Sequence, residues 1–323
     1  MNAPARLIVI LGPTASGKSA LGIRLAKKLD GEIVVCDSTQ VYRRFDIGTA
    51  KILPAAQQGI PHWMIDVVEP AEVFTAGDYR RRAEMVLRDI RARGRVPIVT
   101  AGTGLYLRAL LEGLAEAPTR SEDLRTRLRE ISARRGAAHL HRLLQRVDRE
   151  TSARIAAEDA QKIIRAIEIR LLAKRSVGEV HSRGRAPLEG FSPLKIALRP
   201  PRAALYARIE KRVYEMFDAG WLDEVRQLLR SGVPRDSKPF TFIGYREILA
   251  HLDGTAALPL TVAAAQAPRV RELPRESIIP EIQKSTRHFS KRQLTWFARE
   301  SGAHWLESFG DDPSIESRAL ALL

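Results

Sequence analysis

Residues Leu7–Leu11 read LIVIL, and the eight residues that follow them, Gly12–Ser19, read GPTASGKS. Five apolar residues ended by glycine are typical of a strand that is buried on both faces of a parallel sheet. The second stretch fits G-x-x-x-x-G-K-[ST], a phosphate-binding loop (P-loop) whose backbone N–H groups surround phosphate oxygens. Since Ala20–Leu29 then places apolar residues at helical spacing, we expect the strand, loop and helix that this motif requires.

Strand and helix patterns alternate on both sides of a central region. Beta-branched runs at Glu32–Asp37 and Val96–Thr100 predict two further strands, and Ala76–Arg93 between them has the spacing of an amphipathic helix. This alternation predicts an α/β fold, a parallel P-loop sheet flanked by helices. The later part of the chain completes the sheet and its cover with a strand at Leu194–Leu198 and helices at Arg202–Phe217 and Trp221–Leu229.

The alternation stops between about Pro118 and Lys174. Three arginine-rich segments there have helical periodicity: Leu124–Arg135, Ala137–Val147 and Ala160–Lys174. We therefore expect an inserted all-helical subdomain. The resulting division is a first part of the core at 1–117, a helical insertion at 118–190, and the remainder of the core with C-terminal helices at 191–323. The segment Ala256–Pro280 is rich in alanine and broken by prolines, which favours a long loop or a frayed helix.

Composition narrows the class of protein and of partner. The 323 residues include 53 Lys and Arg against 38 Asp and Glu, a net charge of +15 that favours a polyanionic partner, above all nucleic acid. Hydrophobic residues make up 45% and charged residues 28%, which excludes a disordered or fibrous chain. The single cysteine, Cys36, forms no intrachain disulfide and starts no zinc finger. With no pattern of a signal peptide or membrane span, we expect a cytoplasmic protein that is not inserted in a membrane.

Several residues near the predicted sheet edge carry chemistry. Lys18 supplies a point charge to a bound phosphate, and the Ser19 hydroxyl can ligate Mg²⁺. Asp37 ends a strand at the edge where ligands bind in such sheets. From its position alone it is a general base, a solvated carboxylate or an outer ligand of Mg²⁺. Ala101–Tyr106 (AGTGLY) forms a second glycine turn at this edge, and the strand before it has no terminal acidic residue, which weakens a motor or switch NTPase reading.

Together these stretches resemble the tRNA dimethylallyltransferases, also called tRNA isopentenyltransferases. The resemblance rests on GPTASGKS at 12–19, DSTQVYRRFDIGTAK at 37–51, AGTGLYLRALLEGL at 101–114, FIGYREI at 242–248 and KRQLTWF at 291–297. It implies an enzyme that transfers a dimethylallyl group from dimethylallyl diphosphate to N6 of the adenine 3′-adjacent to the anticodon, at tRNA position 37. The implied partners are this donor and the tRNA anticodon stem-loop, with Mg²⁺ as cofactor and the chain acting as a monomer.

The resemblance also implies a role for individual residues. Asp37 is the general base, Thr103 lies near the reacting centre, and Lys18 and Arg212 stabilise the leaving diphosphate. The diphosphate is held by Gly12, Pro13, Thr14, Ala15, Ser16, Gly17, Lys18 and Ser19, and Ser19 is the metal ligand. The implied tRNA contacts are Asp37, Ser38, Thr39, Gln40, Gln161, Lys162, Ile163, Ile164, Arg165, Thr241, Phe242, Ile243, Gly244, Tyr245, Arg246, Lys291, Arg292, Gln293, Leu294, Thr295, Trp296, Phe297 and Ala298. The helical insertion is expected to contact the anticodon stem.

Alternatives stay open for some of these residues and for the activity. Arg212 can equally be a surface arginine paired with Glu215 or Asp218. The aromatic side chains Tyr245, Trp296 and Phe297 suit base stacking, but such residues are also common in cores. An adenylate isopentenyltransferase that acts on a free nucleotide and a P-loop small-molecule kinase are the competing enzymes. The basic insertion and the KRQLTWF segment favour tRNA over the free nucleotide, and donor-dependent release of diphosphate without ATP turnover would separate the prenyltransferase from the kinase.

The sequence departs from the family pattern at a few positions. His62-Trp63 stands where two histidines are expected, Ala101 begins the glycine turn, and Ala298 stands where arginine usually follows the aromatic residue. The stretch 252–281 is longer and richer in proline than the family pattern. None of these changes removes a chemical group from the expected donor site.

Overall fold

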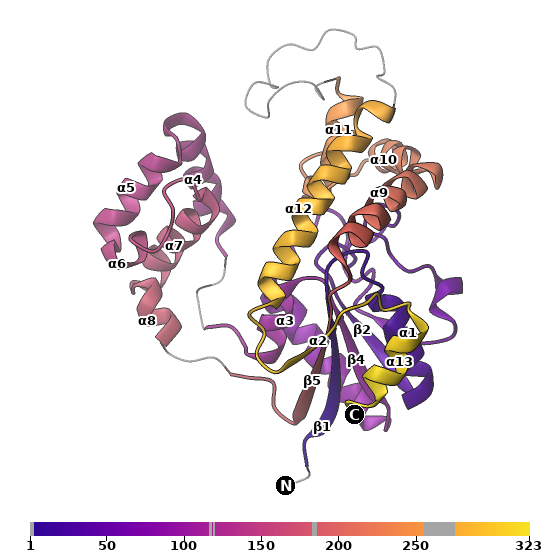
Figure 1. Ribbon diagram of the computed structural model, residues 1–323. Coiled ribbons are helices and arrows are strands. Elements are labelled where there is room, and N and C mark those ends of the chain that lie inside the picture. The colour runs from indigo at the N-terminus through magenta and orange to yellow at the C-terminus, as the bar shows by residue number, and fades with distance from the viewer. Residues whose placement is uncertain (1–2, 116–117, 119, 183–185, 255–274) are drawn as a thin grey trace. The chain divides into compact units, whose positions relative to one another are not determined.

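The chain folds into two compact units, shown in the computed structural model of Figure 1. The structure describes residues 3–115, 118, 120–182, 186–254 and 275–323. The first unit comprises Met1–Leu110 and Glu189–Leu323, and the second comprises Leu111–Leu188. The chain leaves the first unit once and returns to it, as expected for an inserted subdomain.

The first unit is built on a six-stranded parallel sheet with the order β3-β2-β4-β1-β5-β6. Its strands are β1 (Ala5–Leu11), β2 (Gly31–Cys36), β3 (His62–Trp63), β4 (Val96–Ala101), β5 (Phe191–Leu198) and β6 (Ala303–Leu306). The four predicted strands are confirmed. Sequence reasoning missed β3 and β6 because two and four residues are too few to show a period of two.

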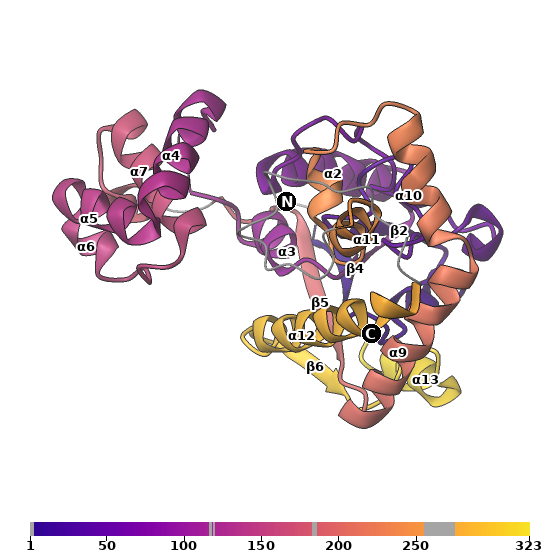
Figure 2. The same cartoon turned by 90° about the horizontal axis from the view of Figure 1, so that it is seen from above.

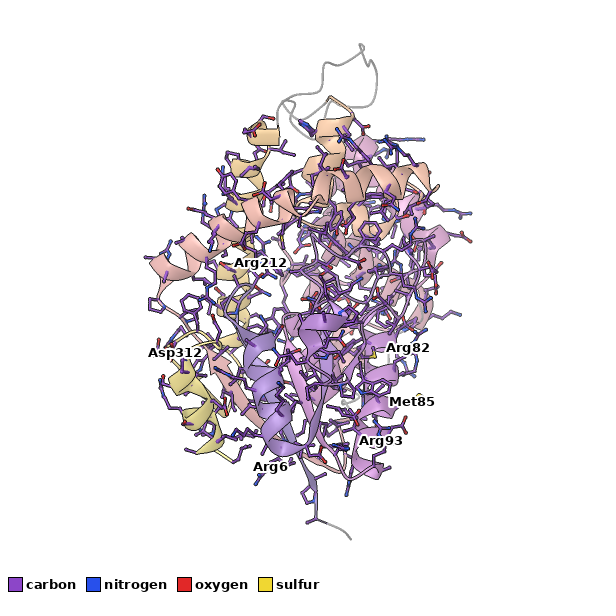
Figure 3. All side chains as sticks on the ribbon, turned by 90° about the vertical axis from the view of Figure 1, so that its right-hand side faces the viewer. Arg6, Arg82, Met85, Arg93, Arg212 and Asp312 are labelled. Carbon is purple, nitrogen blue, oxygen red and sulfur yellow. The ribbon has the colours of Figure 1, made fainter. Side chains whose placement is uncertain are left out.

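Alternate residues of the central strands face opposite layers of helices. In β1, Ile8 and Ile10 join a core with α1 (Lys18–Leu29) and α13 (Pro313–Leu320). On the other side lie α2 (Ala76–Ala92) and α3 (Gly104–Leu111), as Figure 1 shows. Burial on both faces explains why β1 is a continuous apolar run. The outer face of α2 is open to solvent and carries Arg82 and Met85, and Arg93 follows the last residue of this helix (Figure 3).

A second group of helices lies above the carboxyl ends of the strands (Figures 1 and 2). These helices are α9 (Arg202–Asp218), α10 (Trp221–Arg230), α11 (Tyr245–Leu252) and α12 (Ile279–Phe297). They share an apolar core around Phe45, Trp221 and Tyr245. The predicted α9 and α10 are confirmed, whereas α11 and α12 were predicted only as C-terminal helices without bounds. Most of the segment 256–280, which was predicted as a long loop or a frayed helix, lies outside the described residues. At its end Ile279 and Pro280 begin α12, because proline is tolerated in a first turn that needs no N–H donor.

The second unit is entirely helical in its described part. Its helices are α4 (Glu122–Arg135), α5 (Ala137–Val147), α6 (Arg149–Ser152), α7 (Ala160–Ala173) and α8 (Val177–Ser182). The three predicted helical segments are confirmed as α4, α5 and α7, which pack through Leu128, Leu140, Leu144, Ile163 and Ile167.

One buried carboxylate holds α4 to α7. Glu168 is fully buried and accepts hydrogen bonds from the Ser121 amide (2.8 Å) and from both Nε and a terminal nitrogen of Arg125 (2.9 and 2.7 Å). Arg165 donates to the same carboxylate. Burial alone raises the pKa of Glu168, but these donors outweigh it and lower the pKa to about 2. A buried ion pair within the helical insertion therefore connects α4 to α7.

Within the described ranges, no helix has both the length and the apolar content that a membrane crossing requires.

Candidate active site

The loop Gly12–Ser19 joins β1 to α1 and is packed too closely for larger residues. Gly17 has φ +86°, and a Cβ atom there would lie 2.7 Å from the Gly310 nitrogen and from a carboxylate oxygen of Asp311. Glycine is therefore required at this position by conformation and by space. The Lys18 side chain reaches back along the loop, and its Nζ donates to the Pro13 carbonyl at 2.8 Å.

A segment far along the chain braces this loop. The Gly310 amide donates to the Ser16 carbonyl at 2.8 Å. Arg24 of α1 donates to the carbonyls of Gly310 (2.6 Å) and Asp312 (3.0 Å), and Asp312 caps the start of α13. The residues Ser308–Asp312 were not predicted to take part, because no local pattern marks a contact across nearly the whole chain.

The loop offers several groups to an anion or a metal ion. Burial is the largest effect on Lys18 and, with the charge of Arg212, lowers its pKa to about 8 against the opposing influence of Asp37. The Ser16 hydroxyl is fully buried and has no hydrogen-bond partner among the described residues, while Ser19 is exposed. Hydroxyl oxygens beside a phosphate loop suit Mg²⁺, which binds oxygen ligands and keeps several waters.

Asp37 follows β2 and is held in a fixed rotamer. Its Oδ1 accepts from the Thr39 amide (2.8 Å) and the Thr39 hydroxyl (2.6 Å), which leaves Oδ2 free of those bonds. Oδ2 lies next to Gly102, where a Cβ atom would come within 2.8 Å of it. The Thr103 hydroxyl accepts from the Ser38 amide (2.9 Å) and donates to the Ser38 hydroxyl (3.2 Å), so it positions the chain after Asp37.

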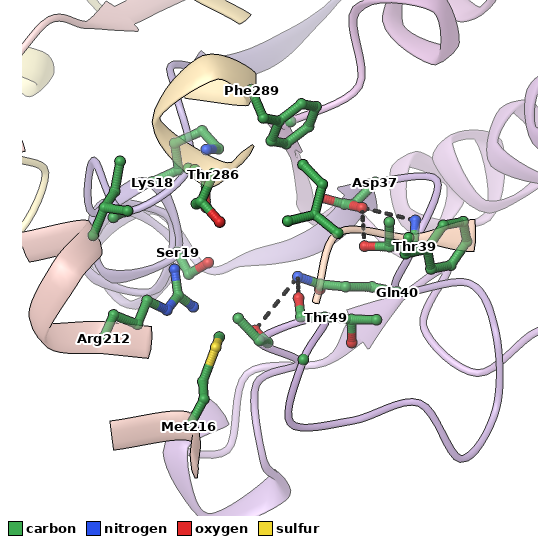
Figure 4. Close-up of a pocket in the computed structure, with 18 of the residues that line it drawn as sticks. Lys18, Ser19, Asp37, Thr39, Gln40, Thr49, Arg212, Met216, Thr286 and Phe289 are labelled. Carbon is green, nitrogen blue, oxygen red and sulfur yellow. Dashed lines mark hydrogen bonds between the residues drawn. The ribbon is translucent and has the colours of Figure 1, made fainter. Parts of the chain in front are cut away.

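These elements meet in a cavity of about 770 Å³ in the first unit (Figure 4). The parallel sheet explains the meeting, because β1, β4 and β2 are neighbours and all end at this edge. The cavity is strongly cationic: its basic lining residues are Lys18, Arg208, Arg212, Lys238, Arg246 and Arg292, against the acidic residues Asp37, Glu215 and Asp311. It therefore combines a phosphate loop with one carboxylate placed at a strand end.

Arg212 belongs to this cavity and is not a surface ion pair. Its guanidinium has no hydrogen-bond or ion-pair partner among the described residues, and burial lowers its pKa although Glu215 and Asp37 act against this. Glu215, one of its two candidate partners, pairs with Lys211 at 3.5 Å. An unpartnered guanidinium in a pocket is available to an anionic ligand.

The rest of the lining is mixed. Uncharged polar residues such as Gln40, Thr49 and Thr286 stand beside an apolar wall, whose members are Ile33, Val35, Ile52, Ile209, Val213, Met216, Trp221, Phe242, Ile243, Ile282 and Phe289. Trp221 packs so tightly under Gly48 and Gly244 that a Cβ atom at either glycine would lie about 2 Å from the indole ring. Tyr245 holds the same region, since its hydroxyl donates to Glu224 (2.6 Å) and accepts from the Gly48 amide (3.1 Å).

Sequence reasoning missed one wall of the cavity. Ile282, Thr286, Phe289 and Gln293 all line it, and their spacing of four, three and four residues is that of one face of α12. This helical periodicity was the signal in the sequence that could have predicted the wall. The prolines before it favoured a long loop or a frayed helix at 256–280.

The residues expected to contact RNA lie in both units, and some are exposed whereas others are buried. Gln161 and Lys162 are exposed on α7 of the second unit, whereas Ile163 and Ile164 lie in its core and Arg165 is tied to Glu168. The exposed candidates of the first unit are Thr241, Arg246, Lys291, Arg292, Thr295 and Ala298. Ser38, Thr39, Gln40, Phe242, Ile243, Leu294 and Trp296 are half-buried, and Gly244, Tyr245, Gln293 and Phe297 are buried.

The expectation of base stacking is corrected for two aromatic residues. Tyr245 and Phe297 are fully buried, so neither ring offers a face to a base. Trp296 packs against α3, where it lies beside Gly104 and under the Arg108 guanidinium, 4.5 Å from the ring centre. Apolar packing decided the place of these rings, as is usual for aromatic side chains on helices that cover a sheet.

Comparisons with known proteins agree with this geometry. A profile described as IPP transferase matches residues 40–300. A tRNA dimethylallyltransferase of Solibacter usitatus is 46% identical over 314 residues, which cover 97% of this chain and 96% of that protein. Another, of Koribacter versatilis, is 46% identical over 98% of this chain and 97% of its own length. The crystal structure of the full-length tRNA isopentenylpyrophosphate transferase of Bacillus halodurans superposes with a TM-score of 0.67 at 32% identity, covering 98% of this chain and 96% of that one. The chain belongs to the IPP transferase family.

Proposed function

We propose that this chain transfers a dimethylallyl group from dimethylallyl diphosphate to N6 of the adenine 3′-adjacent to a tRNA anticodon, and releases diphosphate. The observation that carries the proposal is the single cavity that holds a cationic phosphate loop and the Asp37 carboxylate together. The tRNA dimethylallyltransferase relatives, with 46% identity over nearly the whole chain, support the prenyl transfer and the tRNA substrate.

The donor's diphosphate would bind at the phosphate loop. Lys18 and the unpartnered Arg212 guanidinium are the charges that would stabilise the negative charge that grows on diphosphate as its bond to the prenyl carbon breaks. Mg²⁺, with Ser19 as its protein ligand, would neutralise further charge on the same group. The fixed loop amides need no reorganisation at that moment, which is the source of their catalytic value.

Asp37 would take the proton from the attacking amine. The N6 nitrogen forms a bond to C1 of the prenyl group, the C1–oxygen bond breaks with its electron pair on diphosphate, and one N6 proton passes to the carboxylate. Because the two Thr39 bonds fix Oδ1, the second oxygen has a defined direction in which to accept that proton. The hydrogen bonds of Thr103 to Ser38 support a positioning role for that residue.

The apolar wall would receive the five-carbon group. Val213 and Met216 of α9 and Phe289 of α12 line the cavity, and Figure 4 labels Met216 and Phe289; they would bury a hydrocarbon without competing for its leaving group. Exclusion of water by the bound donor would also strengthen the interaction of Lys18 and Arg212 with diphosphate.

The RNA would reach this cavity with its target base extruded. A stacked base cannot contact Asp37, and unpaired anticodon-loop nucleotides cost least to extrude. The exposed cations Arg246, Lys291 and Arg292 on the first unit, and Lys162 on the helical unit, support binding to phosphates of the anticodon stem-loop. A tRNA substrate supports a cytoplasmic location.

The direct test is mass spectrometry of tRNA nucleosides after incubation with the protein, dimethylallyl diphosphate and Mg²⁺. The expected product is adenosine with a dimethylallyl group on N6, found next to the anticodon and absent when either the donor or Asp37 is removed. Prenylation of free adenosine phosphates with untouched tRNA, or ATP consumption without prenyl transfer, would overturn the proposal in favour of a free-nucleotide enzyme or a kinase.

A further inference from the structure

The inner face of α12 carries a buried amide that connects two loops of the active site. The Gln293 side chain is 6% exposed, its Oε1 accepts from the Thr14 amide at 2.7 Å, and its Nε2 donates to the Gly102 carbonyl at 2.8 Å. Thr14 belongs to the phosphate loop after β1, and Gly102 belongs to the turn after β4. One side chain thus fixes the loop that would hold diphosphate relative to the turn that lies against Asp37.

The turn of α12 that contains Gln293 also carries, on its outer face, residues that are expected to contact RNA. Lys291, Arg292 and Thr295 are exposed, within two residues of Gln293 on either side. Neither Lys291 nor Arg292 forms an ion pair with the described residues; Arg292 lies over the Phe289 ring, 5.8 Å from its centre. A polyanion on this face therefore pulls on the helical turn whose inner side holds both loops.

We propose that Gln293 is a positioning residue that couples RNA binding on the outer face of α12 to diphosphate binding at the phosphate loop, an inference that rests on the proposed function. Its amide is neutral, so it adds no charge to the cavity, and both ends of the amide are used inside the protein. Its burial leaves little of the amide exposed for the RNA contact that its place in KRQLTWF implies. Any movement of α12 on binding RNA changes the Thr14 and Gly102 bonds together, and by linkage diphosphate binding must change RNA affinity by the same factor.

The informative variant is Gln293→Met, which keeps the length and approximate volume of the side chain and removes both bonds. Gln283→Met is the matched control, because Gln283 is also a buried glutamine on α12 but donates to the Glu210 carbonyl of α9 at 3.2 Å. Gln293→Glu is a second variant, since it keeps an acceptor for the Thr14 amide and loses the donor to Gly102.

The measurement is the dissociation constant of inorganic diphosphate with Mg²⁺, taken with and without a saturating anticodon stem-loop RNA. RNA is expected to change that constant by about fivefold or more in the wild type and in Gln283→Met. In Gln293→Met the ratio should fall to about one while the affinity for RNA alone stays within about twofold, and Gln293→Glu should lie between the two.

A wild-type ratio of one, or a ratio that Gln293→Met leaves unchanged, would overturn the inference. If the circular dichroism spectrum shows that Gln293→Met is unfolded, Gln293→Glu becomes the deciding variant. An effect of RNA on the diphosphate dissociation constant as large as in the wild type would then refute the inference. Failure of the proposed function has a different signature, because wild-type protein would then leave the tRNA unmodified in the nucleoside assay whatever the coupling ratio.

Discussion

Lys18 makes donor binding depend on pH in a range where few other groups titrate. The free protein holds its pKa at about 8, because burial and Arg212 oppose the charged form. A bound diphosphate favours the charged form, so binding takes up a proton wherever Lys18 is neutral, and affinity falls as pH rises through 8. At a pKa of about 8 the protonated fraction is about 0.91 at pH 7 and about 0.09 at pH 9, which corresponds to an increase of about tenfold in the dissociation constant.

The assay is calorimetric binding of inorganic diphosphate with Mg²⁺ between pH 7 and 9 at constant ionic strength. Lys18→Arg is the control that keeps the positive charge and does not titrate, so its profile should be flat over this range. Lys18→Met should bind more weakly and also show a flat profile, with RNA affinity close to that of the wild type. Equal affinities of the wild type at pH 7 and pH 9, or the same slope in Lys18→Arg, would refute the reasoning that places Lys18 against the diphosphate.

Three further predictions concern other parts of the chain. Asp37→Ala should lower the single-turnover rate of prenyl transfer by about 10²–10⁴ with donor and RNA affinities nearly unchanged, and a loss below tenfold would remove Asp37 as the base. Replacing Lys291 and Arg292 by alanine should flatten the log–log salt dependence of RNA affinity by about 1.4, which titrations at several salt concentrations would measure; an unchanged slope means that neither residue contacts a phosphate. Glu168→Gln should destabilise the helical unit by about 3 kcal/mol, the equivalent of lowering the pKa from 4.5 to about 2, and in the wild type this contribution is present above pH 4.5 and is lost as pH falls towards 2. Amide hydrogen exchange in α4 and α7 would detect that loss, and equal exchange rates in both proteins would contradict it.

Local patterns in the sequence were sufficient for the central sheet and the phosphate loop. The run at β1 and the glycines of the loop each require only their neighbours along the chain, and Asp37 followed from the rule that parallel strands end at one edge. The same reasoning failed where distant contacts decide a side chain's place. Tyr245 and Phe297 lie in segments whose mixture of basic and aromatic residues is typical of RNA binding, yet both rings are buried in the core. In the sequence Gln293 is one more polar residue in a basic stretch. Only the packing of α12 shows that its side chain points inward.

The bracing of the phosphate loop by residues Ser308–Asp312 has a consequence for how the chain is made. The loop ends at Ser19, but its partner at Gly310 follows nearly 300 residues later. At about 5–20 residues per second, a ribosome needs about 15–60 s to cover that distance. During this time the nascent β1, α1, β2 and β4 can associate while the loop lacks one of its supports and Arg24 lacks its carbonyl partners. A nascent chain therefore acquires a fully supported phosphate loop only after Gly310 has been made.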